Sequence, residues 1–77
     1  MVTCGVLNST DVTQSFSIGY PSTQYALVAV KLGTTFAGLT NRFVEVALSS
    51  SGVVKVVRTD AGLYSGQGVY VVLAKIA

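Results

Sequence analysis

The sequence has 77 residues, of which 51% are hydrophobic and only 10% are charged, and its formal net charge at pH 7 is +2. A chain this short predicts a single domain over residues 1–77, with a small core that disulfides, a metal or association must supplement. Cys4 is the only cysteine and histidine is missing, which excludes an internal disulfide and a structural zinc site. Association remains, and the apolar surplus favours it because exposed apolar patches usually mark interfaces.

The charged side chains are Lys31, Arg42, Lys55, Arg58 and Lys75 against Asp11, Glu45 and Asp60. The cations form no dense stripe of the kind that follows a phosphate backbone, which argues against a nucleic acid partner. The first residues lack the charged start and apolar run of a secretory signal. No apolar segment approaches the roughly 20 residues that span a bilayer. We therefore expect synthesis in the cytoplasm without a signal peptide, and no membrane partner.

Hydrophobic periodicity close to two predicts strands rather than helices along most of the chain. The first strand is predicted over residues 2–6, followed by a turn over residues 8–11. Over residues 12–20 apolar side chains alternate with Thr and Ser, which predicts a half-buried strand with one wet face. Gln14 interrupts its apolar face, which indicates a place near a sheet edge.

Pro21 ends this segment, and residues 24–32 are apolar on both faces, as in a strand that is covered on both sides. Residues 33–41 are interpreted as a loop or a short extra strand. Residues 42–58 predict a β-hairpin with its loop at 50–52, in which Gly52 takes the left-handed conformation. This register places Val46 opposite Val56, and Glu45 diagonal to Lys55 on the other face.

A glycine-rich loop is predicted over residues 59–68, and a last strand over residues 69–76 is apolar on both faces except at Lys75. Such a strand is either central in its sheet or covered by a partner. The chain therefore predicts an all-β fold, a small single-domain sandwich or barrel of about six mostly antiparallel strands.

No group of residues points to catalysis. Without histidine there is no Ser-His-Asp or Cys-His arrangement, and the three acids lie on separate segments. Cys4 alternates with valines and is interpreted as a small buried apolar residue. The glycines of residues 62–68 lack the lysine of a phosphate-binding loop and precede a strand instead of a helix. We predict no enzyme, no catalytic residue, no metal and no cofactor.

Leu63 and Tyr64 are the candidate protein-contact residues. They are large apolar side chains in the middle of a loop where exposure is expected, and tyrosine is enriched among residues that anchor interfaces. We expect them to lie at or near a contact with another protein surface.

Low charge, abundant Val, Ser, Thr and Gly, and the rhythm of short strands extend over the whole chain. In these features the sequence resembles the small all-β accessory proteins of phage virions, such as capsid decoration (cement) proteins and short tail components. The resemblance implies a homo-oligomer, often a trimer, that binds at junctions between capsid subunits and stabilises the lattice of the virion.

Two other interpretations stay open. A carbohydrate-binding or other small-ligand module would use Tyr20, Tyr64 and the polar loops, and requires a trough of exposed aromatic rings. A small nucleic-acid-binding barrel requires cations and aromatic rings on one face. Lys55 and Arg58 are predicted on opposite faces of one strand, which counts against the barrel.

Overall fold

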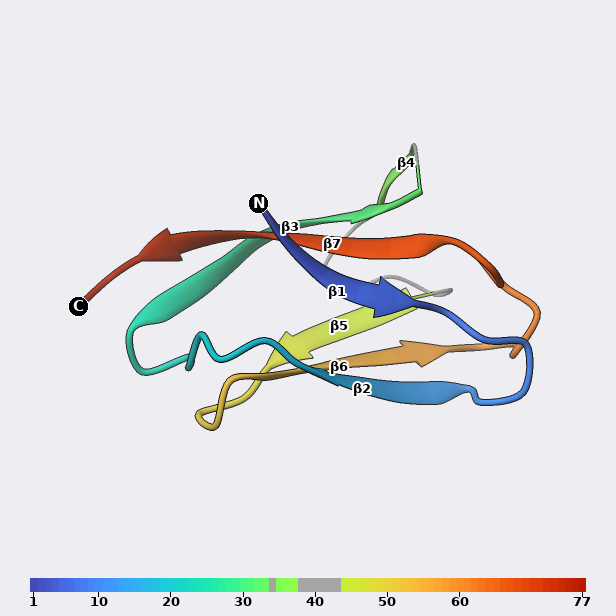
Figure 1. Cartoon of the computed structure of the whole chain (residues 1–77), viewed down its shortest axis with the longest axis horizontal. Helices are drawn as coiled ribbons and strands as arrows, with labels where there is room; N and C mark the ends of the chain where they lie inside the picture. Colours follow the sequence, from blue (N-terminus) through green and yellow to red (C-terminus); the bar gives the residue numbers. More distant parts are fainter. Residues whose placement is uncertain (34, 38–43) are drawn as a thin grey trace.

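Two antiparallel sheets lie face to face in the computed structural model, which describes residues 1–33, 35–37 and 44–77 (Figure 1). The four-stranded sheet has the order β1-β7-β3-β4, with β1 at Val2–Val6, β7 at Gly68–Lys75, β3 at Tyr25–Leu32 and β4 at Thr35–Ala37. The three-stranded sheet has the order β2-β6-β5, with β2 at Thr13–Ser17, β6 at Val53–Arg58 and β5 at Val44–Leu48. The all-β prediction is confirmed, and the architecture is a sandwich.

The region predicted as a loop or a short extra strand contains β4, which pairs with the end of β3. The predicted loop residues 38–41 and the cation Arg42 lie outside the described residues. Within residues 1–33, 35–37 and 44–77, no helix is long and apolar enough to cross a membrane.

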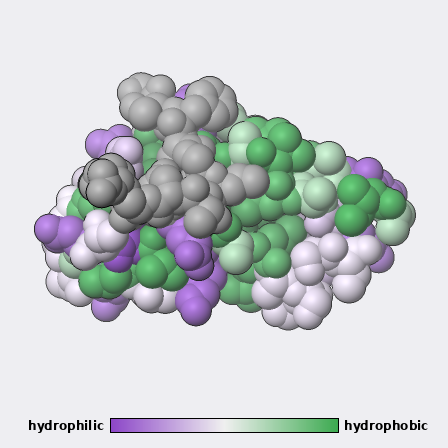
Figure 2. Space-filling model, turned by 180° about the vertical axis from the view of Figure 1, so that it is seen from behind, coloured by the Kyte–Doolittle hydropathy of each residue, from purple (hydrophilic) through white to green (hydrophobic). Residues whose placement is uncertain are grey.

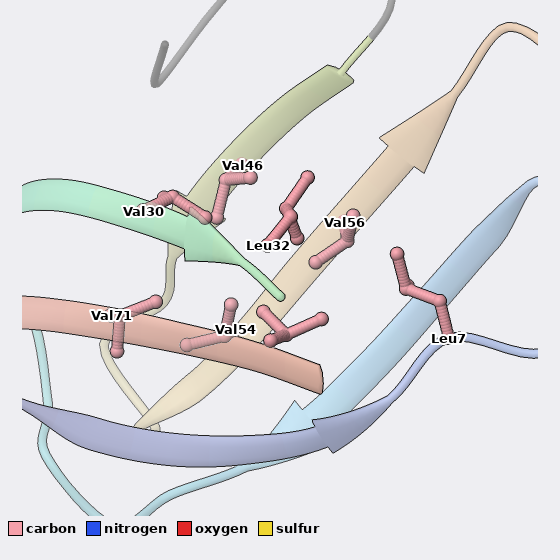
Figure 3. Close-up of a cluster of buried hydrophobic side chains, with 8 residues drawn as sticks. Leu7, Val30, Leu32, Val46, Val54, Val56 and Val71 are labelled. Carbon is pink, nitrogen blue, oxygen red and sulfur yellow. The ribbon is translucent and has the colours of Figure 1, made fainter. Parts of the chain in front are cut away.

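Among the described residues, eight buried aliphatic side chains form the core between the two sheets. They are Leu7, Val30, Leu32, Val46, Val54, Val56, Val69 and Val71. Figure 3 shows seven of them labelled, pointing from β3, β5, β6, β7 and the segment after β1 into the space between the sheets. Most are valines, whose branched Cβ suits the pleated surface of a strand. Because side chains alternate along a strand, every second residue of β7 is left for the outer face.

The β5–β6 hairpin has the predicted register. Val46 pairs with Val56, and Ala47 pairs with Lys55, so Glu45 is diagonal to Lys55. Gly52 has φ +80°, as the hairpin loop requires. The Gly52 carbonyl also accepts hydrogen bonds from the backbone N–H groups of Ile18 (2.9 Å) and Gly19 (3.2 Å). The tip of this hairpin therefore fixes the chain where it leaves β2.

The last strand is predicted to be either central in its sheet or covered by a partner, and β7 is central in its sheet. It pairs with β1 on one side and with β3 on the other. The β1 pairing is interrupted by a bulge between Thr3 and Gly5. At Gly5 (φ +154°) the ring of Phe16 lies so close that a Cβ would be 2.8 Å from two of its carbons. Glycine therefore lets an aromatic ring of β2 close one side of the sandwich.

Candidate interaction surface

The two outer faces of the sandwich differ in chemistry. The outer face of the four-stranded sheet, here called the aliphatic face, carries the side chains that alternate with the core residues: Thr3, Val6, Ala26, Ala29, Lys31, Tyr70, Val72 and Ala74. Lys31 is its only charged residue among those that the structure describes, and its Nζ lies 5.8 Å from the centre of the Tyr70 ring. Val6 is 60% exposed, so an aliphatic side chain meets water here.

The outer face of the three-stranded sheet, here called the polar face, is mainly polar, although β6 also presents the half-buried Val53 and Val57 on it. Its exposed side chains are Thr13, Ser15, Ser17, Glu45, Ala47 and Lys55. Because both faces belong to one small domain, the polar face shows what a water-facing surface of this chain looks like. The aliphatic face departs from that pattern, and exposed apolar patches usually mark interfaces.

Apolar surface also continues around the side of the molecule. Figure 2, seen from behind, shows a broad area of hydrophobic residues beside the grey atoms in the middle of the long axis. Val28 is 53% exposed and lies at the irregularity in the β3–β7 pairing between Leu27 and Ala29. Beyond the core the chain thus presents more apolar side chains than its own fold can bury.

Leu63 and Tyr64, the predicted contact residues, are half-buried and pack against the core. Their loop is held at both ends by backbone hydrogen bonds, from Leu63 to Asp60 (3.0 Å) and from Gln67 to Tyr64 (3.1 Å). Tyr64 has φ +54° and is the only non-glycine residue with positive φ in the described part of the chain. The buried part of each side chain therefore stabilises the fold. That the exposed part of each contacts another protein stays a prediction.

Arg58 is buried, with 2% of its surface exposed. Its Nη1 donates to the carbonyls of Ala61 (2.7 Å) and Leu63 (2.8 Å), and its Nη2 donates to Gln14 Oε1 (3.1 Å) and to the Asp11 carbonyl. Every acceptor is a neutral oxygen, and Nε has no partner. One guanidinium therefore holds together the turn before β2, β2 itself and the loop after β6.

Sequence analysis missed this role and counted Arg58 among scattered cations. The signal was its position: Arg58 continues the alternation of Val54 and Val56, so it belongs to the inner face of β6. Lys55 is exposed on the opposite face, as predicted. Gln14 is in the edge strand β2, and its inward side chain accepts from Arg58 and from the Asn8 N–H (2.9 Å).

The tyrosines proposed for a ligand trough are not brought together. The two tyrosines lie at opposite ends of β6. Tyr20 comes directly after Gly19, whose N–H donates to the Gly52 carbonyl just before β6, whereas Tyr64 lies in the loop after β6 that Arg58 binds. Tyr20 instead contacts Tyr25 edge to face, with ring centres 5.1 Å apart. No pocket is present in the described part of the chain, so these rings offer no shared binding trough.

Cys4 packs against the core, and burial raises the pKa of its thiol to about 11 from 9.0. The thiol therefore stays protonated at neutral pH and is a poor nucleophile. In the residues that the structure describes, no three His, Cys, Asp or Glu side chains are grouped as metal ligands.

We expect the raised pKa of Cys4 to make the fold less stable as pH rises from 9.0 to about 11. In this window the unfolded chain loses the thiol proton before the folded chain does, so ionisation favours unfolding; below 9.0 the contribution is fully present. Urea unfolding across this pH range should show that the free energy of unfolding falls more steeply with pH for the wild type than for Cys4→Ala. Parallel curves for the two proteins would contradict the assignment.

Comparison of the sequence and fold with protein-family models, curated proteins and solved structures gives no match. The functional argument therefore rests on the surfaces of the molecule itself.

Proposed function

We propose that this chain is a structural protein that assembles on other protein surfaces through its aliphatic face. The observation that carries the proposal is the contrast between the two outer faces. One is aliphatic with Lys31 as its described charge, and the other carries the hydroxyl groups of β2 with Glu45 and Lys55 around the half-buried Val53 and Val57. A domain with one apolar face and one solvent-facing polar face fits a subunit that binds flat on a larger protein assembly.

The finer proposal is a virion accessory role, as a capsid decoration (cement) protein that stabilises a lattice as a homo-oligomer. It is supported by the low charge and strand rhythm of the whole chain. It is also supported by mechanics, because a sheet face built on a valine core is a rigid platform that loses little conformational entropy when it binds.

Lysines placed on the aliphatic face should abolish assembly and leave the fold intact. Val6→Lys with Val72→Lys puts two charges into the proposed contact, and each long side chain can reach water in the free chain. Ala47→Glu is the control, because it adds a long charged side chain to the exposed polar face, where its cross-strand partner Lys55 has the opposite charge. We expect the free energy of unfolding of both variants to be within about 1 kcal/mol of the wild-type value.

The measurement is sedimentation of tagged chains expressed in the native source. Wild type and Ala47→Glu should sediment with large protein particles at a fixed ratio of copies, and the double variant should remain at the top of the gradient. A wild-type chain that also stays at the top, or a double variant that sediments with the particles, would refute assembly through this face.

A further inference from the structure

β2 is an outer strand whose free backbone groups point away from the sandwich. Just outside its two ends, the Arg58 N–H donates to the Val12 carbonyl (2.8 Å) and the Ile18 N–H donates to the Gly52 carbonyl (2.9 Å). Because antiparallel pairs alternate in hydrogen bonding, even-numbered residues of β2 bond to β6 and odd-numbered residues face outward. Thr13, Ser15 and Ser17 therefore present their N–H and C=O groups along an open edge.

This edge lacks the features that stop strands from pairing with other chains. Natural outer strands are guarded by charge, proline, a bulge or short length. β1 has a bulge, β4 has three residues, and β5 carries Glu45. β2 has five residues, an unbroken register with β6, and neither a charge nor a proline. Among the described strands it is the one whose edge is open and regular.

We propose that two copies of this chain pair through β2, antiparallel, about a two-fold axis at Ser15. In this register Ser15 lies opposite Ser15 of the second copy, and Thr13 lies opposite Ser17. These are the residues with outward backbone groups, so each opposed pair exchanges two hydrogen bonds and no group on the edge is left unpaired. The two three-stranded sheets then become one continuous sheet.

The side chains of β2 favour a second copy over an unrelated strand. On the polar face each opposed pair is hydroxyl against hydroxyl, a cross-strand combination that stabilises antiparallel sheets. A two-fold contact requires a surface that complements itself, and a run of Thr, Ser and Ser about a central residue meets that requirement. The pairing uses a sheet edge and leaves the aliphatic face free, so it goes beyond the proposed function and does not depend on it.

The test compares two double variants that differ in the sign of one charge. Thr13→Lys with Ser17→Lys places like charges opposite each other twice in the dimer, whereas Thr13→Lys with Ser17→Glu places opposite charges there. Within one copy the changes are exposed and far apart, so both variants should fold. Light scattering over a concentration series should show a wild-type dimer, a monomer for the Lys/Lys variant and a dimer for the Lys/Glu variant.

Ser15→Pro supplies a second measurement. The Ser15 N–H points away from β6, so proline keeps the β2–β6 ladder and removes two central hydrogen bonds of the dimer. We expect a folded monomer at every concentration. In hydrogen exchange of the wild type, the Ser15 amide should become protected as the dimer forms, while the Gln14 amide is protected throughout.

A wild-type chain that stays monomeric overturns the inference, as does a Lys/Glu variant that is monomeric like the Lys/Lys variant. A dimer that is lost in the Val6→Lys, Val72→Lys variant but kept in the Lys/Lys variant also overturns it, because association would then run through the aliphatic face. Conversely, a wild-type chain that forms the β2 dimer but does not sediment with particles would refute the proposed function alone.

Discussion

Replacing Arg58 by alanine is expected to lower the free energy of unfolding by about 3–4 kcal/mol. The change removes the donors of four hydrogen bonds, and the oxygens of Asp11, Gln14, Ala61 and Leu63 lose their partner. Bonds to a charged donor are worth about twice those between neutral groups. A chain of this size has a total stability of roughly 4–12 kcal/mol, so the loss is a large share of it.

Lys55→Ala is the matched control, because it removes a cation from the same strand on the exposed face. We expect it to change stability by less than about 0.5 kcal/mol. Arg58→Lys keeps the charge but cannot reproduce a forked donor that reaches three segments at once. Its loss of stability should therefore lie between those of Arg58→Ala and Lys55→Ala. Equal unfolding midpoints in urea for Arg58→Ala and Lys55→Ala would show that the buried guanidinium does not stabilise the fold.

Gly52→Ala is expected to destabilise the chain by about 3 kcal/mol, of which roughly 1 kcal/mol is the cost of positive φ for alanine. A Cβ at this position would lie 3.0 Å from the Tyr20 nitrogen and 3.1 Å from two backbone carbons of Gly19. Backbone atoms cannot rotate away as a side chain does. The hairpin tip must therefore move, and the hydrogen bonds that its carbonyl accepts from Ile18 and Gly19 weaken.

Gly66→Ala provides the comparison that separates the two causes. Gly66 has the same φ of +80°, but nothing lies within 4 Å of the position of its Cβ. We expect it to lose only the roughly 1 kcal/mol due to backbone conformation. Chemical denaturation of both variants measures the difference, and equal losses would show that the close approach at Gly52 is relieved without cost.

Local patterns predicted most of the strands because alternation and turn chemistry act over a few residues. The register of the β5–β6 hairpin followed from Gly52 and the placing of its loop, and the structure has Val46 opposite Val56. The neighbours of β7 did not follow, since pairing of the first with the last strand depends on long-range packing that no local pattern encodes.

The surfaces were harder to predict than the strands. Leu63 and Tyr64 lie in the expected loop, but periodicity cannot show that a loop folds back on the core. The aliphatic face could be expected only as a surplus of apolar residues, because the sequence of β3 and β7 does not say which of their two faces lies inside. Arg58 shows the reverse case, a polar residue at an inward position whose acceptors lie in the following loop and in a turn at the other end of the sequence.

The central place of β7 has a consequence for how the protein is made. β7 lies between β1 and β3 in its sheet, so the first strand and the third have no common neighbour until residues 68–75 have been synthesised. The β5–β6 hairpin is local and can form earlier, whereas pairing across nearly the whole chain is slow. The four-stranded sheet therefore closes late, because β1 and β3 are joined only when β7 pairs with both of them.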